Sequence, residues 1–347
     1  MPNVSLTFRC NLRCPYCFAH EFVEEAADDI TLENFDAALE FLTRTRPVHL
    51  GLIGGEPTLH PQFGEILARA AGHERVTGVT VYTNGILLDR FFDEVTHPKV
   101  SLLVNWNSPE MLGERPFARV RDAVDELVFN RHMEHRLNLG LNLHGEATDY
   151  GYLIELLRRY GLHKVRVSLT VPDFPQGCTT DTLSYFRAHK AFLLALIEDM
   201  DAADVLPYYD CNRPPWCIWT DEEKRRIAEI VAKRGTDERY GDAERSLLDT
   251  KSFCRPVIDI TPDLQAVRCF GMAYFEKVPI SEFATLDELQ AHFMRRIDRR
   301  AFRIRASEEC ENCPWRRTWQ CSQGCMGFKG NEIERLIAEA GEAPVRR

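Results

Sequence analysis

Six short, apolar, β-prone runs occur in the first half of the chain, the pattern expected of buried strands. They cover residues 4–8, 48–53, 76–82, 100–106, 137–143 and 165–170. Segments with apolar residues at helical spacing separate them, at residues 32–42, 61–71, 117–130 and 150–160. Strands that alternate with helices form βαβ units, so the sequence predicts a parallel sheet, either open and doubly wound or closed into a complete or partial barrel.

Residues at the helix ends support this reading. Thr31 precedes the first helical segment and is predicted as its N-cap. Pro61 is expected in the first turn of the next helix, and Gly161 is expected just past the C-terminus of the segment 150–160.

The pattern changes after residue 172. Residues 181–200 form a strongly apolar helical segment and 221–234 a charged amphipathic one. From residue 254 onward the chain is irregular, with a predicted hairpin (257–261 and 266–270) and helices near 286–300 and 332–340. The sequence therefore predicts three parts: the part with alternating strands and helices over 1–215, a helical linker over 216–253 and a further domain over 254–347.

Charge and hydropathy narrow the class of partner. The 347 residues include 43 Lys and Arg against 53 Asp and Glu, a formal net charge of −10. An acidic balance argues against nucleic acid or an anionic membrane as the main partner. No apolar run is long enough to cross a bilayer, and the N-terminus shows no export signal, so we expect a cytoplasmic protein.

Twelve cysteines are unexpected in such a chain, because cytosolic thiols stay reduced. Their uneven distribution favours metal ligands or catalytic groups over disulfides. Three lie within eight residues at Cys10, Cys14 and Cys17, and the next is Cys178. The remaining eight lie at positions 211, 217, 254, 269, 310, 313, 321 and 325.

The first group has the spacing C-x₃-C-x₂-C and follows the first predicted strand, at the carboxyl end where α/β folds place their sites. With an aromatic residue, Tyr16, before the third cysteine, the segment resembles the radical S-adenosylmethionine (SAM) superfamily. The resemblance implies a partial (β/α)₆ TIM-like barrel. It also implies a 4Fe-4S cluster held by Cys10, Cys14 and Cys17, with SAM on the remaining iron and Tyr16 at its adenine.

Polar residues after later strands match further positions of that family. Gly54, Gly55 and Glu56 stand where the family has a motif that binds the SAM amino group. Thr83 lies in a turn triplet that many relatives share, although a plain turn would explain it equally well. The resemblance implies SAM carboxylate and ribose contacts for three further residues, Asn105, Asn107 and Ser168. The family's Gly-x-Ile-x-Gly-x-x-Glu motif is not matched around residues 139–146.

The later cysteines resemble the SPASM/twitch extension, which implies one or two auxiliary 4Fe-4S clusters. The ligands that it implies are Cys254, Cys269, Cys310, Cys313, Cys321 and Cys325. The chain departs from the pattern in three ways: Leu264 replaces a usual Gly, seven residues separate Cys313 from Cys321, and no cysteine follows Cys325. Cys211 and Cys217 could supply the missing ligands or have no such role, and a structural zinc site is the alternative for the last four cysteines.

The resemblance implies an enzyme that reductively cleaves SAM to a 5′-deoxyadenosyl radical, which abstracts hydrogen from a substrate carbon. An external one-electron donor of flavodoxin or ferredoxin type is expected. A peptide or protein side chain is favoured as substrate. The first strand begins near residue 4, so no leader-binding domain is expected before the barrel, which weakens that preference. Oxidation of a small molecule (an aminocyclitol, a sugar or a natural-product intermediate) is the alternative, and a non-catalytic iron–sulfur or zinc protein is the alternative of another class.

Overall fold

The chain divides into two compact units, each assembled from segments that are distant in the sequence. Unit 1 takes in Met1–Asn138 and Pro256–Met294, and unit 2 takes in Leu139–Arg255 and Arg295–Pro344. The computed structural model describes residues 1–17, 29–145, 148–170, 181–234, 237–241, 247–249, 253–272 and 275–342, so Cys178 lies outside the described residues. The predicted parts 1–215, 216–253 and 254–347 follow sequence motifs and stay a prediction.

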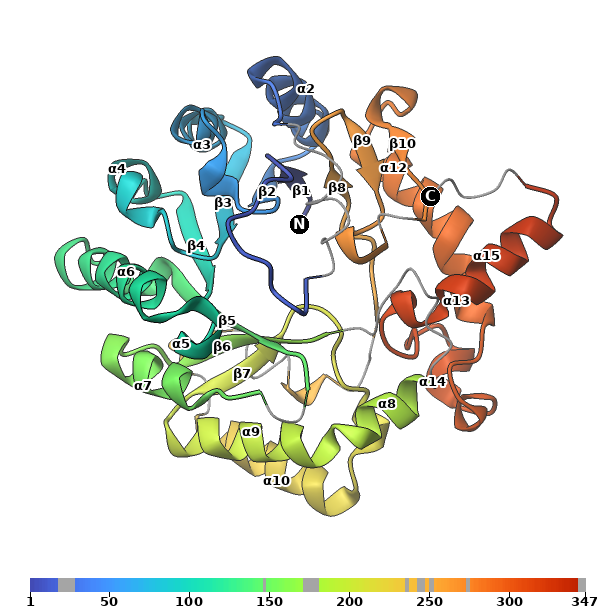
Figure 1. The fold of residues 1–347 in the computed structure, drawn as a ribbon. Coiled ribbons are helices and arrows are strands. Elements are labelled where there is room, and N and C mark those ends of the chain that lie inside the picture. Colours follow the sequence, from blue (N-terminus) through green and yellow to red (C-terminus); the bar gives the residue numbers. More distant parts are fainter. Residues whose placement is uncertain are drawn as a thin grey trace. The chain divides into compact units, whose positions relative to one another are not determined.

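Unit 1 is built on seven strands in the order β10-β9-β8-β1-β2-β3-β4 (Figure 1). They are β1 (Asn3–Ser5), β2 (Val48–Ile53), β3 (Val76–Thr83), β4 (Val100–Asn105), β8 (Asp259–Ile260), β9 (Gln265–Val267) and β10 (Val278–Pro279). Strands β1 to β4 are parallel, as predicted. The predicted hairpin forms β8 and β9, and β8 pairs in parallel with β1, with Val4 opposite both Leu52 and Ile260. The C-terminal hairpin therefore continues the sheet of the first four strands.

Unit 2 contains three parallel strands. They are β5 (Leu137–Leu143), β6 (Lys164–Leu169) and β7 (Leu206–Tyr209). The first two match predicted strands, and in their register Asn142 lies opposite Ser168. The third was not predicted as a strand, because Pro207 and two tyrosines interrupt the apolar pattern.

Helices lie outside the strands in both units (Figure 1). Those of unit 1 are α2 (Leu32–Thr43), α3 (Phe63–Gly72), α4 (Phe92–Val95), α5 (Pro109–Leu112), α6 (Glu114–Asp125) and α12 (Leu286–Phe293). Those of unit 2 are α7 (Gly151–Tyr160), α8 (Thr182–Ala188), α9 (Lys190–Ala202), α10 (Asp221–Ala232), α13 (Arg299–Arg303), α14 (Pro314–Arg317) and α15 (Gly330–Glu339). The helix predicted over 181–200 is two helices, which meet at His189.

The ends of these helices confirm two of the three predicted signals. The Thr31 hydroxyl accepts a hydrogen bond from the Asn34 backbone N–H at 3.0 Å, and Gly161 adopts a left-handed conformation with φ of 62°. Pro61 was wrongly placed in the first turn, because α3 begins only at Phe63.

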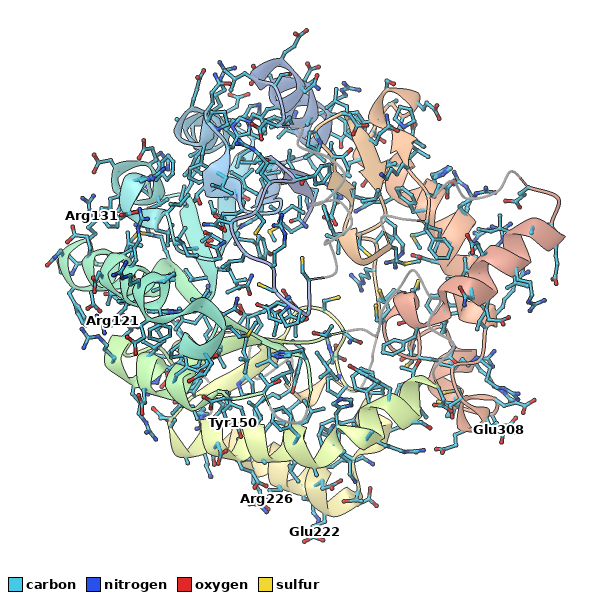
Figure 2. The ribbon with its side chains drawn as sticks, viewed as in Figure 1. Arg121, Arg131, Tyr150, Glu222, Arg226 and Glu308 are labelled. Carbon is cyan, nitrogen blue, oxygen red and sulfur yellow. The ribbon has the colours of Figure 1, made fainter. Side chains whose placement is uncertain are left out.

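Burial follows the predicted alternation of strands and helices. Val4, Leu50, Leu52, Val79 and Val104 are fully buried, so the apolar positions of these strands contribute to the core of unit 1. Charged side chains such as Arg121 of α6 and Glu222 and Arg226 of α10 point away from the strands (Figure 2). Among the described residues, no helix has the length and apolar character needed to span a membrane.

Candidate functional site

The loop after β1 brings together three thiols. Cys10, Cys14 and Cys17 are half-buried, and a turn joins the last two through a 3.0 Å hydrogen bond from the Cys17 N–H to the Cys14 carbonyl. Burial raises the pKa of Cys10 to about 11, and the charges of Glu56, Cys14 and Cys17 add to that rise. These four groups therefore lie within electrostatic reach of one another, which fits a set of soft thiolate donors for an iron–sulfur cluster.

Gly54 and Gly55 follow β2, and the backbone that leads into the cysteine loop packs against them. The Gly55 N–H donates to the Thr7 carbonyl and the Glu56 N–H to the Arg9 carbonyl, both at 2.8 Å. A Cβ atom added to Gly54 would lie 2.4 Å from the Thr7 carbonyl oxygen, and one added to Gly55 would lie 2.3 Å from that of Arg9. The two glycines thus allow two backbone segments, the end of β2 and the start of the cysteine loop, to approach each other closely.

Glu56 is the centre of the hydrogen bonds at this edge of the sheet, and only 1% of it is exposed. Its Oε1 accepts from the Thr58 N–H at 3.1 Å, the Thr58 hydroxyl at 2.6 Å and the Thr83 hydroxyl at 2.7 Å. Its Oε2 accepts from the Asn84 N–H at 2.7 Å. Burial raises the pKa of Glu56, and these bonds oppose the rise. Because a carboxylate oxygen has two lone pairs, Oε2 can accept one more donor.

Two asparagines at the ends of β3 and β4 hold the cysteine loop. The Asn84 side-chain amide donates to Asn11 Oδ1 at 2.7 Å. The Asn107 amide donates to the Cys14 sulfur at 3.3 Å, and the Tyr16 hydroxyl donates to Asn107 Oδ1. The structure thus brings Tyr16, Asn107 and Cys14 together, and their implied roles toward SAM and the cluster stay predictions. Asn84 was not predicted as a site residue, although its position beside Thr83 in the same turn could have suggested it.

The other two residues predicted to contact SAM, Asn105 and Ser168, differ in their surroundings. Asn105 ends β4, and its Oδ1 is buried without a hydrogen-bond partner in the described part of the chain. Such an orphaned acceptor fits a position that a polar ligand completes. Ser168 is half-buried on β6 of unit 2, and its role stays a prediction. Beside it on the same unit, Arg166 donates to Asn142 Oδ1 at 2.8 Å and to Asp210 Oδ1 at 2.9 Å, which links three polar side chains.

The β8–β9 hairpin packs against the cysteine loop within unit 1. The rings of Phe8 and Phe270 lie 6.2 Å apart, and Cys17 and Ile53 pack against this pair. Cys269 precedes Phe270, so it belongs to the same region of the unit. The hairpin turn passes through Leu264 with φ of 61°, a left-handed conformation that explains why glycine is usual at this position.

The other implied ligands, Cys254, Cys310, Cys313, Cys321 and Cys325, belong to unit 2. No group of three or more His, Cys, Asp or Glu side chains within the described residues is arranged to hold a metal ion. That holds for Cys10, Cys14 and Cys17 as well. The corners of a four-iron cluster lie further apart than the ligands of a single ion, so thiols can suit a cluster without surrounding one ion.

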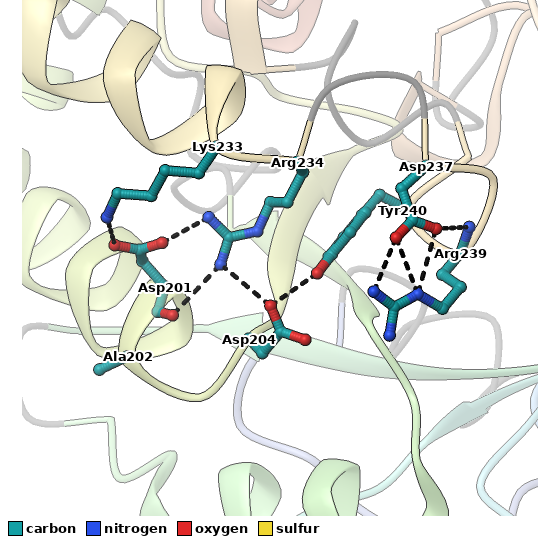
Figure 3. Close-up of a pocket in the computed structure, with 8 residues that line it drawn as sticks. All are labelled: Asp201, Ala202, Asp204, Lys233, Arg234, Asp237, Arg239 and Tyr240. Carbon is teal, nitrogen blue, oxygen red and sulfur yellow. Dashed lines mark hydrogen bonds and ion pairs between the residues drawn. The ribbon is translucent and has the colours of Figure 1, made fainter.

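A hollow of about 410 Å³ lies between the end of α9 and the residues that follow α10 (Figure 3). Its charged walls are paired with one another: Asp201 accepts from Lys233 at 2.7 Å, and Asp204 accepts from the Tyr240 hydroxyl at 2.6 Å. The hollow is at the amino end of β7, whereas folds of this kind place their catalytic sites at the carboxyl ends of the strands. We interpret it as an ion-pair network that stabilises unit 2.

Comparisons with known proteins match the part of the chain that carries the cysteine loop. A family model described as the radical SAM superfamily matches residues 4–110. The GTP 3′,8-cyclase of Synechocystis is 30% identical over 146 residues, which are 41% of this chain and 43% of that protein. Among curated relatives, the match spans from 14% to about half of their own length.

Solved structures resemble the chain along nearly all its length. Native anSMEcpe with bound AdoMet has a TM-score of 0.60 at 15% identity and covers 98% of both chains. Streptococcus suis SuiB bound to the precursor peptide SuiA has a TM-score of 0.60 at 12% identity, over 99% of this chain and 74% of that one. This likeness concerns the fold, and it confirms the predicted α/β fold with a TIM-like barrel.

Proposed function

Since residues 4–110 identify the chain as a member of the radical SAM superfamily, we propose that it cleaves SAM reductively and removes a hydrogen atom from a substrate carbon. The observation that carries the proposal is the loop in which Cys10, Cys14 and Cys17 share one site with Glu56. A 4Fe-4S cluster bound by these thiolates would supply the electron for the cleavage. An external donor of flavodoxin or ferredoxin type would deliver that electron.

The residues around the loop would position SAM. Glu56 Oε2, which has acceptor capacity left, would accept from the SAM ammonium, while Thr58, Thr83 and Asn84 keep the carboxylate in place. The unpartnered Oδ1 of Asn105 would accept a second hydrogen bond from SAM.

Asn107 would orient the cysteine loop. Asn107 holds Cys14 through its amide N–H and Tyr16 through its amide oxygen, so a single side chain fixes two members of the loop. Hydrogen bonds to cluster sulfurs are one of the ways in which a protein sets a cluster's reduction potential.

Anaerobic reconstitution with iron and sulfide, followed by addition of SAM and dithionite, tests this activity. We expect the wild-type chain to release 5′-deoxyadenosine and Cys14→Ala to release none. Ser101→Ala, on β4 but away from the cysteine loop, is a suitable control and should match the wild type. Equal background amounts from wild type and Cys14→Ala would favour the non-catalytic alternative.

We propose a peptide or protein side chain as the substrate. Support comes from the fold shared with SuiB, whose structure was determined with a precursor peptide. A second candidate, a small molecule, is supported by the relatives named GTP 3′,8-cyclase, which match up to about half of this chain.

Hydrogen transfer can decide between these candidates. Deuterated short peptides encoded near the gene, and deuterated GTP, would be incubated with the reconstituted enzyme and SAM. The true substrate is expected to pass deuterium to 5′-deoxyadenosine, whereas an unreactive compound leaves that product unlabelled. Label from GTP but from none of the peptides would overturn the peptide assignment.

A further inference from the structure

Two cysteines whose role the sequence left open, Cys211 and Cys217, follow β7 in unit 2. Five implied cluster ligands belong to the same unit. They are Cys254, Cys310, Cys313, Cys321 and Cys325. The described part of unit 2 therefore holds seven thiols, which we divide into two sets by their neighbours.

Arg187 of α8 connects Cys217 with the turn that contains Cys310. Cys217 lies in a helical turn, Trp216–Ile218, that packs against α8. The Arg187 guanidinium makes two bonds of 2.6 and 2.7 Å to the carboxylate of Glu309, the neighbour of Cys310. The bond to Glu309 raises the pKa of Arg187, and the charge of Cys217 adds to the rise. One guanidinium is thus close to both cysteine-bearing segments.

The first set consists of four thiols. Burial raises the pKa of Cys310 to about 11, with further contributions from Cys217, Cys321 and Cys313. Burial also raises the pKa of Cys217, to which Cys321 and Cys313 contribute. The packing of the Cys217 turn on α8 and the Arg187–Glu309 pair beside Cys310 bring these segments together, and the mutual charge effects agree with that placement. The Gln323 N–H points at the Cys321 sulfur at 3.2 Å, a contact that suits a thiolate.

The second set consists of three thiols. The thiol of Cys325 is hydrogen-bonded to those of Cys211 and Cys254, and these contacts, together with burial, raise the pKa of Cys325 well above the usual range. The Cys254 N–H donates to the Ser322 hydroxyl at 2.9 Å, which fixes this segment beside the loop that carries Cys325. Cys269 belongs to unit 1, and its part in this set stays a prediction.

A buried cation faces both sets. Lys329 is 2% exposed, and its ammonium donates to the carbonyls of Ala301, Ile304 and Ser322 at 2.9, 3.2 and 2.9 Å. Burial lowers its pKa to about 8, and the charges of Cys310, Cys321 and Cys254 oppose that decrease. A positive charge held in this position would compensate the negative charge of thiolate-bound clusters.

We propose that Cys217 is the fourth ligand of an auxiliary iron–sulfur cluster bound by Cys310, Cys313 and Cys321, and that Cys211 joins Cys254 and Cys325 at a second cluster. The segment after β7 thereby supplies the ligands that the C-terminal motif lacks after Cys325. This inference rests on the part of the proposed function in which the C-terminal cysteines bind iron, and it is independent of SAM cleavage.

The test is iron counting and EPR spectroscopy on the full chain, reconstituted anaerobically. Three clusters correspond to about 12 irons per chain, and we expect Cys217→Ala and Cys211→Ala each to bind about 8. Ile218→Val changes the same turn without removing a thiol and should keep about 12. The EPR signal of the SAM-binding cluster, identified by its response to added SAM, should persist in both cysteine variants and shows that they are folded.

Cys217→Ser provides a second measurement, because its hydroxyl can still bind iron. We expect this variant to keep its iron content and to change one auxiliary EPR signal. Wild-type iron content and spectra in Cys217→Ala would overturn the proposal, as would zinc in place of iron at these cysteines. If instead the auxiliary clusters form as proposed but no 5′-deoxyadenosine appears, the proposed function fails and this assignment stands.

Discussion

Asp259 allows a quantitative test of how the β8–β9 hairpin is fixed to the barrel. The carboxylate is 2% exposed, accepts from the Asn3 amide at 2.6 Å and also accepts from the Phe270 N–H. Burial raises its pKa from 3.8 to about 6. Between these two pH values the folded state keeps a proton that the unfolded state has released, so the free energy of unfolding falls as the pH rises.

The size of this effect follows from the shift. About two pKa units at 1.36 kcal/mol each give a loss of about 3 kcal/mol between acid and neutral pH, roughly half of it between pH 5 and pH 7.5. Asp259→Asn removes the charge and keeps the shape. Within the described residues, Asn3 Oδ1 is buried without a hydrogen-bond partner, so rotation of the Asn3 amide would offer an acceptor to the new NH₂ group, while the remaining oxygen still accepts from the Phe270 N–H.

We therefore compare the free energy of unfolding of Asp259→Asn with that of wild type. We expect the difference, variant minus wild type, to be about 1.4 kcal/mol larger at pH 7.5 than at pH 5. Urea unfolding under anaerobic conditions, followed by circular dichroism, measures the difference. Asp259→Ala is the control: it leaves the Phe270 N–H and the Asn3 amide without partners, and since neither variant titrates here it should be less stable than Asp259→Asn by about 2–4 kcal/mol at either pH. If the difference between Asp259→Asn and wild type is the same at both pH values, burial does not control this carboxyl and the reasoning is refuted.

Three further substitutions test other parts of the structure. Leu264→Gly should be more stable than Leu264→Ala by about 0.5–1 kcal/mol in urea unfolding, because only glycine adopts a φ of 61° without strain; equal stabilities would contradict this. Asn84→Ala removes the bonds to Asn11 at 2.7 Å and from Ile86 at 3.1 Å, so it should lower the free energy of unfolding by about 1–3 kcal/mol and release iron faster during gel filtration. Lys329→Met should destabilise the chain by about 2 kcal/mol more at pH 9.5 than at pH 7.5. The pKa of Lys329 is lowered to about 8 in the folded state, so above this pH the folded wild type loses a proton that the unfolded state keeps, and the wild type gains stability. An effect that does not change with pH in urea unfolding would show that the ammonium is not buried as described.

The sequence predicts most of the strands and the first cysteine loop because both depend on local patterns. Residues 48–53 are apolar apart from His49, residues 137–143 alternate leucine with Asn or Gly, and the structure has strands with the same bounds. The helix predicted over 181–200 was wrong in its continuity, since nothing in its apolar spacing marks the break at His189. The short strand β7 was missed because its pairing with β6, rather than its composition, makes it a strand.

The candidate site likewise combines residues that the sequence predicted with contacts that it did not. Cys10, Cys14, Glu56 and Asn107 were predicted from motif positions, and the structure brings them together. The contact between Asn84 and Asn11 joins residues 73 positions apart, so only the fold reveals it. Similarly, the approach of Cys217 and Cys211 to the C-terminal cysteines depends on chain segments that meet in three dimensions, and spacing could only leave them as alternatives.

The pairing of β1 with β8 sets an order for biosynthesis. The Asn3 and Asp259 side chains are joined across 256 positions of sequence, and Val4 has Ile260 as its neighbour on one side. During translation β2 becomes available to β1 early, but the other edge of β1 stays open until more than two thirds of the chain has emerged. Phe270, which packs with Cys17, arrives later still. The cysteine loop is therefore completed only late in synthesis, and a cluster inserted into a nascent chain would occupy a pocket that still lacks one wall.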